Sequence, residues 1–135
     1  PNKNYFTLRQ NRLDDLISIA LFDLIVNNGD RKGGHFLEDL NGKIWSIDHG
    51  LTFHQEFKLR TVMFEYCGSL FPDGLIDDAK KLVNQLETKA KEHNILTEQI
   101  SNIEITALIT RLNLIIENPE HPVLDPYIDV PWPLI

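Results

Sequence analysis

The chain has 135 residues, of which 42% are hydrophobic and 24% charged, a composition typical of a single globular domain. Its formal net charge of −7 argues against general nucleic-acid binding, because proteins with that role present a basic face to phosphate backbones. The single cysteine and the absence of an apolar run of about 18 residues indicate a cytoplasmic protein without disulfides, thiolate zinc or an integral membrane span.

The first predicted element is a helix from residue 12 to 26. Apolar residues recur on most of its sides, which predicts a largely buried helix. Asn27-Asn28-Gly29 is a helix stop signal, and the polar segment NNGDRKGGHF (27–36) begins there. This segment carries one acid, two bases and an imidazole among three glycines. A loop attached to a rigid buried helix is a common place for functional side chains.

A β-hairpin is predicted over residues 35–48. The strand-like runs HFLED and KIWSID flank Asn41-Gly42, and this dipeptide favours a two-residue turn. In that register His35 lies directly opposite Asp48, on one face and beside the loop 27–36. Trp45 is expected to join the core.

The remainder is expected to form an irregular segment (49–72), C-terminal helices (73–118) and an extended proline-rich tail (119–135). The first of these helices is expected to run from Asp73 to about His93, and Ser101 and Glu104 predict a capping box that opens the last one. Tyr127 and Trp132 are expected to pin the tail to the surface. The predicted fold class is mainly α with a small β-hairpin (α+β), in one domain of residues 1–135.

Isolated side chains have simpler interpretations. We expect His54 to bond to the backbone of its own loop, His93 and His121 to lie at the surface, and Cys67 to act as a small buried hydrophobe.

Asp30, His35 and Asp48 are three proton- or metal-handling groups that this layout brings together. Phosphoryl transfer needs a group that orients the acceptor hydroxyl and an oxygen-ligated metal ion that bridges the donor phosphates. Asp30, on a glycine-flanked loop, suits the first role, and Asp48 suits the second. In the alternative interpretation, Asp30 only forms a turn and Asp48 only caps the end of a strand.

The order of these motifs resembles the catalytic loop and metal-binding motif of phosphatidylinositol 3- and 4-kinases. More closely, the chain resembles an uncharacterised bacterial family of that kinase-like superfamily, and the likeness covers nearly everything from Leu13 onward. The residues that carry it are Asn27-Asn28, Asp30-Arg31-Lys32-Gly33-Gly34-His35, Asp48-His49-Gly50, Lys58-Leu59-Arg60-Thr61-Val62 and Pro131-Trp132-Pro133.

The resemblance implies the C-terminal lobe of a phosphatidylinositol 3-/4-kinase-like fold, with 49–72 as an activation-like segment, and ATP-dependent phosphotransfer with Mg²⁺ or Mn²⁺. The acceptor stays open between protein, lipid and small molecule. The implied roles are catalytic for Asp30, Arg31 and Lys32, metal-binding for His35 and Asp48, cofactor-binding for Gly33, Gly34 and His49, and substrate recognition for Lys58 and Arg60.

Three positions depart from the lipid-kinase pattern. Lys32 stands where these kinases usually have His, His35 where they have a metal-binding Asn, and His49 where they have Phe. Imidazole is a softer ligand than an amide, which favours Mn²⁺ or other transition ions over Mg²⁺.

No glycine-rich strand pair and no strand-borne lysine precede the catalytic loop in this sequence. The resemblance therefore implies an N-terminal lobe, or a partner domain, that covers the site face. We expect the 135 residues alone to be inactive, with apolar surface exposed around Phe36 and Ile47.

Two other functions stay open. One is a non-catalytic pseudokinase or interaction module. The other is a divalent-metal phosphohydrolase that uses His35, Asp48, His49 and His54.

Overall fold

The computed structural model of the chain describes residues 3–135, and within these it contains five α-helices and one two-stranded antiparallel sheet. In chain order the elements are α1 (Tyr5–Leu8), α2 (Leu13–Val26), β1 (Phe36–Glu38), β2 (Ile44–Ser46), a 3-10 turn (Phe64–Tyr66), α3 (Asp73–Glu87), α4 (Lys91–Thr97) and α5 (Asn102–Glu117). The mainly helical α+β class expected from the sequence is confirmed. Across residues 3–135, no helix combines the length and the apolar character needed to cross a membrane.

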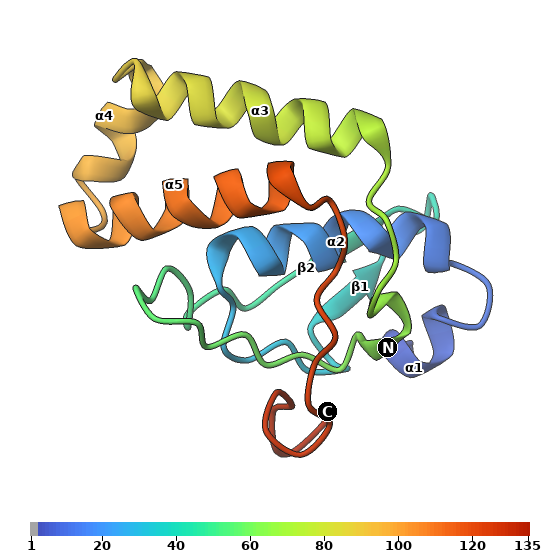
Figure 1. Cartoon of the computed structure of the whole chain (residues 1–135). Coiled ribbons are helices and arrows are strands. Elements are labelled where there is room, and N and C mark those ends of the chain that lie inside the picture. The colour runs from blue at the N-terminus through green and yellow to red at the C-terminus, as the bar shows by residue number, and fades with distance from the viewer. Residues whose placement is uncertain (1–2) are drawn as a thin grey trace.

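The helices are arranged in layers. The helix α5 lies between α3 and α2, and the hairpin β1–β2 packs against α2 (Figure 1). The buried face of α2 contributes to two neighbouring clusters, one with α1 and β1 and one with α5 and the tail. Leu16 and Phe36 are fully buried in the first cluster, and each such side chain contributes about 1.5–3 kcal/mol of burial free energy.

The helix α2 ends at Asn27, which adopts the left-handed conformation (φ 57°, ψ 52°) that closes many helices. Its side chain then holds a distant segment. Nδ2 donates to the carbonyls of His54 (2.8 Å) and Glu56 (2.6 Å), and Oδ1 accepts from the backbone N–H of Lys58 (2.8 Å). The predicted stop is confirmed, and the same residue also holds residues 54–58 of the irregular segment.

The hairpin exists, but its predicted register is wrong by one residue. The observed pairs are Phe36 with Ser46, Leu37 with Trp45 and Glu38 with Ile44, so the loop has three residues in place of two. The cause is Asp39. Its Oδ1 accepts from the backbone N–H groups of Asn41 and Lys43 (both 2.9 Å), and Gly42 completes the turn at φ +80°.

The predicted helix from Asp73 to about His93 is interrupted. The helix α3 ends at Glu87, Lys89 takes a left-handed conformation (φ 54°), and the separate helix α4 follows. The capping box of α5 is confirmed, because Ser101 Oγ accepts from the N–H of Glu104 while the Glu104 carboxylate accepts from the N–H of Ser101.

The tail runs from the end of α5 across α2 toward the loop 27–36 (Figure 1). Tyr127 and Trp132 do not pin it, since they are 89% and 72% exposed. Backbone bonds hold it instead, including Thr61 N to Asp129 O (3.0 Å) and Gly33 N to Leu134 O (2.7 Å).

Several expectations for single side chains are wrong. Trp45 is half-exposed, with its indole N–H donating to Asp39 Oδ2 (3.0 Å), and this bond holds the pKa of Asp39 below its usual value. His121 is buried, and burial lowers its pKa. Phe36 is fully buried and Ile47 is half-buried, but Leu37 and Leu40 beside them are exposed, so the expected apolar surface lies on neighbouring residues of the hairpin.

Three further expectations have mixed outcomes. His54 bonds to its own loop as expected, since Nδ1 accepts from the N–H of Glu56 at 3.0 Å. His93 and Cys67 are both half-buried, so neither the surface histidine nor the fully buried thiol is confirmed.

Candidate functional site

A buried ion pair underlies the loop 27–36. The guanidinium of Arg31 is fully buried, with Nε 2.7 Å from Asp23 Oδ2 and Nη2 2.9 Å from Asp23 Oδ1. Nη1 donates to the carbonyls of His35 and Ile47, both at 3.0 Å. Asn28 Nδ2 donates to the same carboxylate at 3.1 Å. One side chain therefore fixes the loop to α2 and to both ends of the hairpin.

This arrangement differs from the expected catalytic role of Arg31. A side chain with no exposed surface cannot contact a ligand in this conformation, so Arg31 positions the loop. Sequence reasoning missed its partner Asp23. The available signal was an acid in the middle of an otherwise apolar helix, eight residues before Arg31, since buried charges are almost always paired.

Four predicted site residues form a continuous row on top of this support. Lys32 Nζ lies 3.9 Å from Asp30 Oδ1, the Lys32 backbone N–H donates to His35 Nδ1 (3.3 Å), and His35 Nε2 lies 3.4 Å from Asp48 Oδ2. The side chains of Asp30 and Asp48 are 30% and 61% exposed, so both carboxylates reach solvent. Because Asp48 takes a left-handed conformation (φ 61°), its side chain meets His35 despite the shifted register.

The hydrogen bonds of His35 define its role. Nδ1 accepts from the backbone N–H of Lys32 at 3.3 Å, and Nε2 lies 3.4 Å from Asp48 Oδ2. A metal-ligating imidazole uses the opposite arrangement, with its second nitrogen donating a proton to another group. In this conformation His35 contacts Asp48, and its Nδ1 does not make the donated hydrogen bond that usually accompanies the metal-binding role implied by the resemblance.

Within residues 3–135, no three His, Cys, Asp or Glu side chains are grouped so that they could hold a metal ion together. The phosphohydrolase set is therefore not assembled, because His54 faces its own backbone and His49 Nε2 lies 3.3 Å from Ser46 Oγ. A magnesium ion bound mainly to nucleotide phosphates needs only one or two protein carboxylates. Asp48 fits that smaller requirement.

The two glycines expected to bind cofactor serve the packing of the chain. The N–H of Gly33 donates to Leu134 O (2.7 Å), and its carbonyl accepts from the N–H of Tyr5 (2.8 Å). A Cβ on Gly33 would lie 2.7 Å from the Phe6 ring, and one on Gly34 would contact Ile135. Gly33 is thus required for close approach of both chain ends and has no free N–H for a phosphate.

The residues expected to recognise substrate are exposed and backbone-anchored. Lys58 is held through Asn27, and the backbone of Arg60 bonds to Asn28 O (3.0 Å) and to the N–H of Arg31 (2.9 Å). Arg60 and Asp30 line the same cavity, of about 310 Å³. His49 is exposed beside the Phe22 ring, with ring centroids 5.4 Å apart, and it does not line that cavity.

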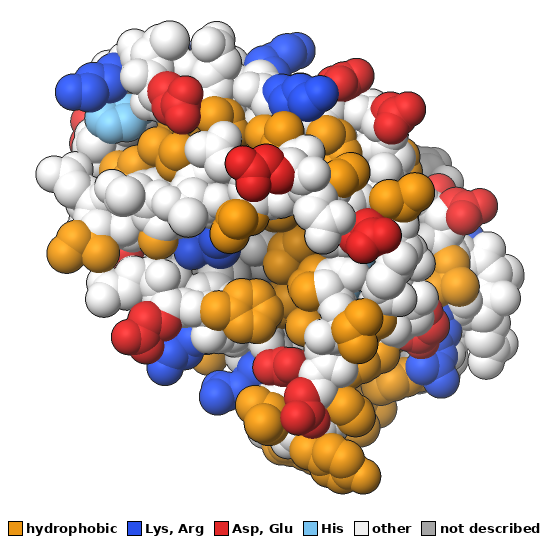
Figure 2. Space-filling model, viewed as in Figure 1, with side chains coloured by type: hydrophobic (Ala, Val, Ile, Leu, Met, Phe, Trp, Pro, Cys, Tyr) orange, Lys and Arg blue, Asp and Glu red, His pale blue; other side chains and the backbone are white. Residues whose placement is uncertain are grey.

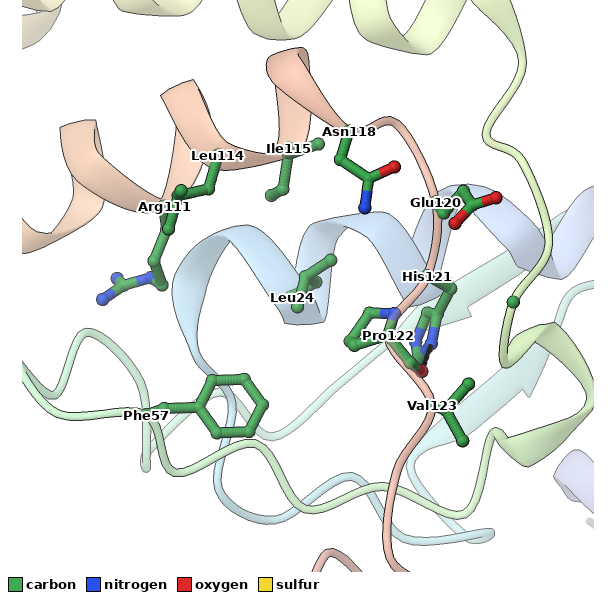
Figure 3. Close-up of a pocket in the computed structure, with 11 residues that line it drawn as sticks. Leu24, Phe57, Arg111, Leu114, Ile115, Asn118, Glu120, His121, Pro122 and Val123 are labelled. Atoms are coloured by element: carbon green, nitrogen blue, oxygen red, sulfur yellow. Dashed lines mark hydrogen bonds between the residues drawn. The ribbon is translucent and has the colours of Figure 1, made fainter.

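A second cavity, of about 450 Å³, lies between α2, α5 and the start of the tail (Figure 3). Its lining is largely apolar and includes Leu24, Phe57 and Ile115. The adjacent Arg111 is tied to the protein itself, since Nε donates to Ile25 O (2.9 Å) and Nη1 to His54 O (3.1 Å). None of the predicted site residues line this cavity.

Comparison with known proteins gives one informative likeness. Over 115 residues, 85% of this chain, the sequence is 36% identical to Protein Rv2133c of Mycobacterium tuberculosis (strain ATCC 25618 / H37Rv). The chain spans 41% of that relative's length, and the relative's name states no activity. No protein-family model matches the chain. No solved structure matches it.

Proposed function

We propose that the chain is the C-terminal catalytic lobe of an ATP-dependent phosphotransferase of the phosphatidylinositol 3-/4-kinase-like superfamily, which its motifs resemble. One observation carries the proposal. Asp30 on the loop 27–36 and Asp48 just after β2, the two carboxylates that the resemblance assigns to acceptor and metal, both reach solvent, and the buried Arg31–Asp23 pair supports both segments. Lys32 and His35 join them into a single row.

The chemistry follows from this row. Phosphoryl transfer depends almost entirely on positioning and charge neutralisation. Asp30 orients the acceptor hydroxyl and takes its proton, and Lys32, 3.9 Å away, offsets negative charge beside it. Asp48, which lies beside His35, would hold Mg²⁺ or Mn²⁺, whose positive charge would offset the negative charge of the ATP phosphates.

The donor phosphates also need a second lobe, which we propose as the partner of this chain. More than half of the M. tuberculosis relative lies outside the matched part, which leaves room for such a lobe in that protein. Exposed apolar side chains near the hairpin and the loop after it support a covered face here, namely Phe22, Leu37, Leu40 and Leu51.

Phosphotransfer and nucleotide binding, measured on this chain joined to its partner lobe, test the proposal. We expect Asp30→Asn to lower transfer by about 10²- to 10⁴-fold with little change in ATP affinity, because Asp30 acts on the acceptor. Asp48→Asn should weaken metal-dependent ATP binding as well. Asp77→Asn, an exposed position on α3, is the matched control.

Three outcomes separate the alternatives. Equal loss of ATP binding in Asp30→Asn and Asp48→Asn would show that the two roles are wrongly assigned. ATP binding without any transfer would favour the non-catalytic pseudokinase. Transfer by the 135 residues alone, lost in Asp30→Asn, would show that no partner lobe is needed.

A further inference from the structure

The cavity that contains Asp30 is closed on one side by the C-terminal tail. Asp30 and Arg60 contribute from the loop and the activation-like segment, and Tyr127 and Trp132 contribute from the tail. The loop and the tail, about a hundred residues apart in sequence, therefore meet at Asp30, the carboxylate that we propose orients the acceptor hydroxyl. Its volume of about 310 Å³ is at the small end of the range for small-molecule sites.

The tail is ordered at this point, yet its aromatic rings are not used for packing. Backbone bonds from Thr61 and Gly33 hold it, and Pro131 between them is buried. Tyr127 and Trp132 nevertheless remain 89% and 72% exposed. Hydrophobic side chains gather where the tail lies at the lower end of the face in Figure 2, with acidic side chains among them and basic side chains beside them. Exposed aromatic rings on an anchored backbone beside a cavity are suited to stacking against a ligand.

The charges at this cavity are divided between two groups. Within the described residues 3–135, the guanidinium of Arg60 has no carboxylate within 4.0 Å, and Asp30 has only Lys32 at 3.9 Å. A free guanidinium binds phosphate or carboxylate through two parallel hydrogen bonds. The cavity thus offers the Asp30 carboxylate to accept a hydrogen bond from a hydroxyl, the Arg60 guanidinium to bind an anionic group, and a flat aromatic face.

We propose that this cavity is the acceptor site and takes a small hydroxylated anion of monosaccharide size, such as a sugar phosphate. This rests on the proposed function. The ligand's anionic group binds Arg60, its C–H face packs on Trp132, and one hydroxyl faces Asp30. In the transfer step that hydroxyl oxygen bonds to the γ-phosphorus of ATP, the bond from γ-phosphorus to the β–γ bridging oxygen breaks, ADP leaves with the electron pair, and the hydroxyl proton passes to Asp30.

Trp132 provides a direct measurement of binding, because the chain has only two tryptophans. In a Trp45→Phe background, the indole emission is followed while glucose 6-phosphate, glucose or inorganic phosphate is added to the full chain. We expect glucose 6-phosphate to change the emission saturably and to bind at least tenfold more tightly than glucose or phosphate. Arg60→Gln should weaken it by about ten- to a hundredfold, the loss of one charge-assisted hydrogen-bonding group. Lys81→Gln, an exposed cation on α3, should leave it unchanged.

No emission change with any of the three compounds would overturn the proposal. So would phosphate binding as tightly as the sugar phosphate, which would indicate a simple anion site. The failure of the proposed function is distinguishable, since this assay needs no ATP. Binding without transfer would leave the cavity assignment standing and remove the kinase. If phosphate transfer depends on Asp30 but the KM for the acceptor is unchanged by Arg60→Gln, the kinase proposal stands and the cavity assignment is wrong.

Discussion

Arg31→Met tests whether the loop 27–36 depends on the buried ion pair. The substitution keeps an unbranched apolar stem that ends near the position of Nε, and it removes four hydrogen bonds, two to Asp23 and two to the carbonyls of His35 and Ile47. Breaking a buried pair costs about 3–5 kcal/mol, because the remaining charge is stranded. The two carbonyls add about 1 kcal/mol each, so the free energy of unfolding should fall by about 5–7 kcal/mol. That is a large share of the roughly 5–15 kcal/mol typical of a domain.

Urea unfolding followed by far-ultraviolet circular dichroism measures this loss. Arg9→Met is the matched control, since Arg9 Nη1 also lies 2.7 Å from a carboxylate, that of Glu65, but the two side chains are 43% and 27% exposed. Its loss should be about 1 kcal/mol or less. Replacing both partners, as Arg31→Met with Asp23→Leu, should restore part of the stability. An Arg31→Met variant no less stable than Arg9→Met would refute the reasoning that this pair supports the loop.

Two further variants test the packing of the tail. Gly33→Ala should lower the free energy of unfolding by about 1–3 kcal/mol in the same urea assay, because the new Cβ would lie 2.7 Å from the Phe6 ring. The control Gly74→Ala, which has open space in α3, should raise it by up to about 1 kcal/mol. Equal effects of the two substitutions would contradict the close approach at Gly33. His121 is buried with its pKa lowered by burial, so the unfolded chain binds the proton that the folded chain resists, and stability should fall as pH drops below about 6.5. The slope should approach at most about 1.4 kcal/mol per pH unit and should vanish in His121→Gln; an unchanged slope between pH 5 and 6.5 in that variant would assign the effect to other groups.

The parts of the fold that were predictable depend on local signals. The helix α2 and its end at Asn27 follow from apolar spacing and a stop signal, and the start of α5 follows from its capping box. The hairpin was predictable, but its register was not, because the Asp39 side chain captures two N–H groups of the turn and selects a three-residue loop. Asn41-Gly42 alone does not contain that information.

The candidate site was predictable as a set of neighbours and less so as a set of roles. His35 and Asp48 meet at 3.4 Å, whereas Asp30 is linked to them only through Lys32, so the expected group of three forms in part. Arg31 and Gly33 lie in the motif that suggests a functional role, yet both are occupied by structural contacts. Arg31 pairs with Asp23, and Gly33 bonds to Tyr5 and Leu134, all of which lie outside the motif. Long-range packing decides which polar groups are already hydrogen-bonded within the protein, and no local sequence pattern contains that information.

The double use of Gly33 has a practical consequence for protein engineering. Its carbonyl accepts from the N–H of Tyr5 and its own N–H donates to Leu134 O, so residues near both ends of this chain are attached to the same loop residue. A tag, fusion or surface linker placed directly after Ile135 would pull on that residue, which lies close to Asp30 in the chain. Spacers there should be long and flexible, and an immobilised chain is better attached through an exposed lysine of α3, such as Lys80, because α3 lies on the other side of α5 from α2 (Figure 1).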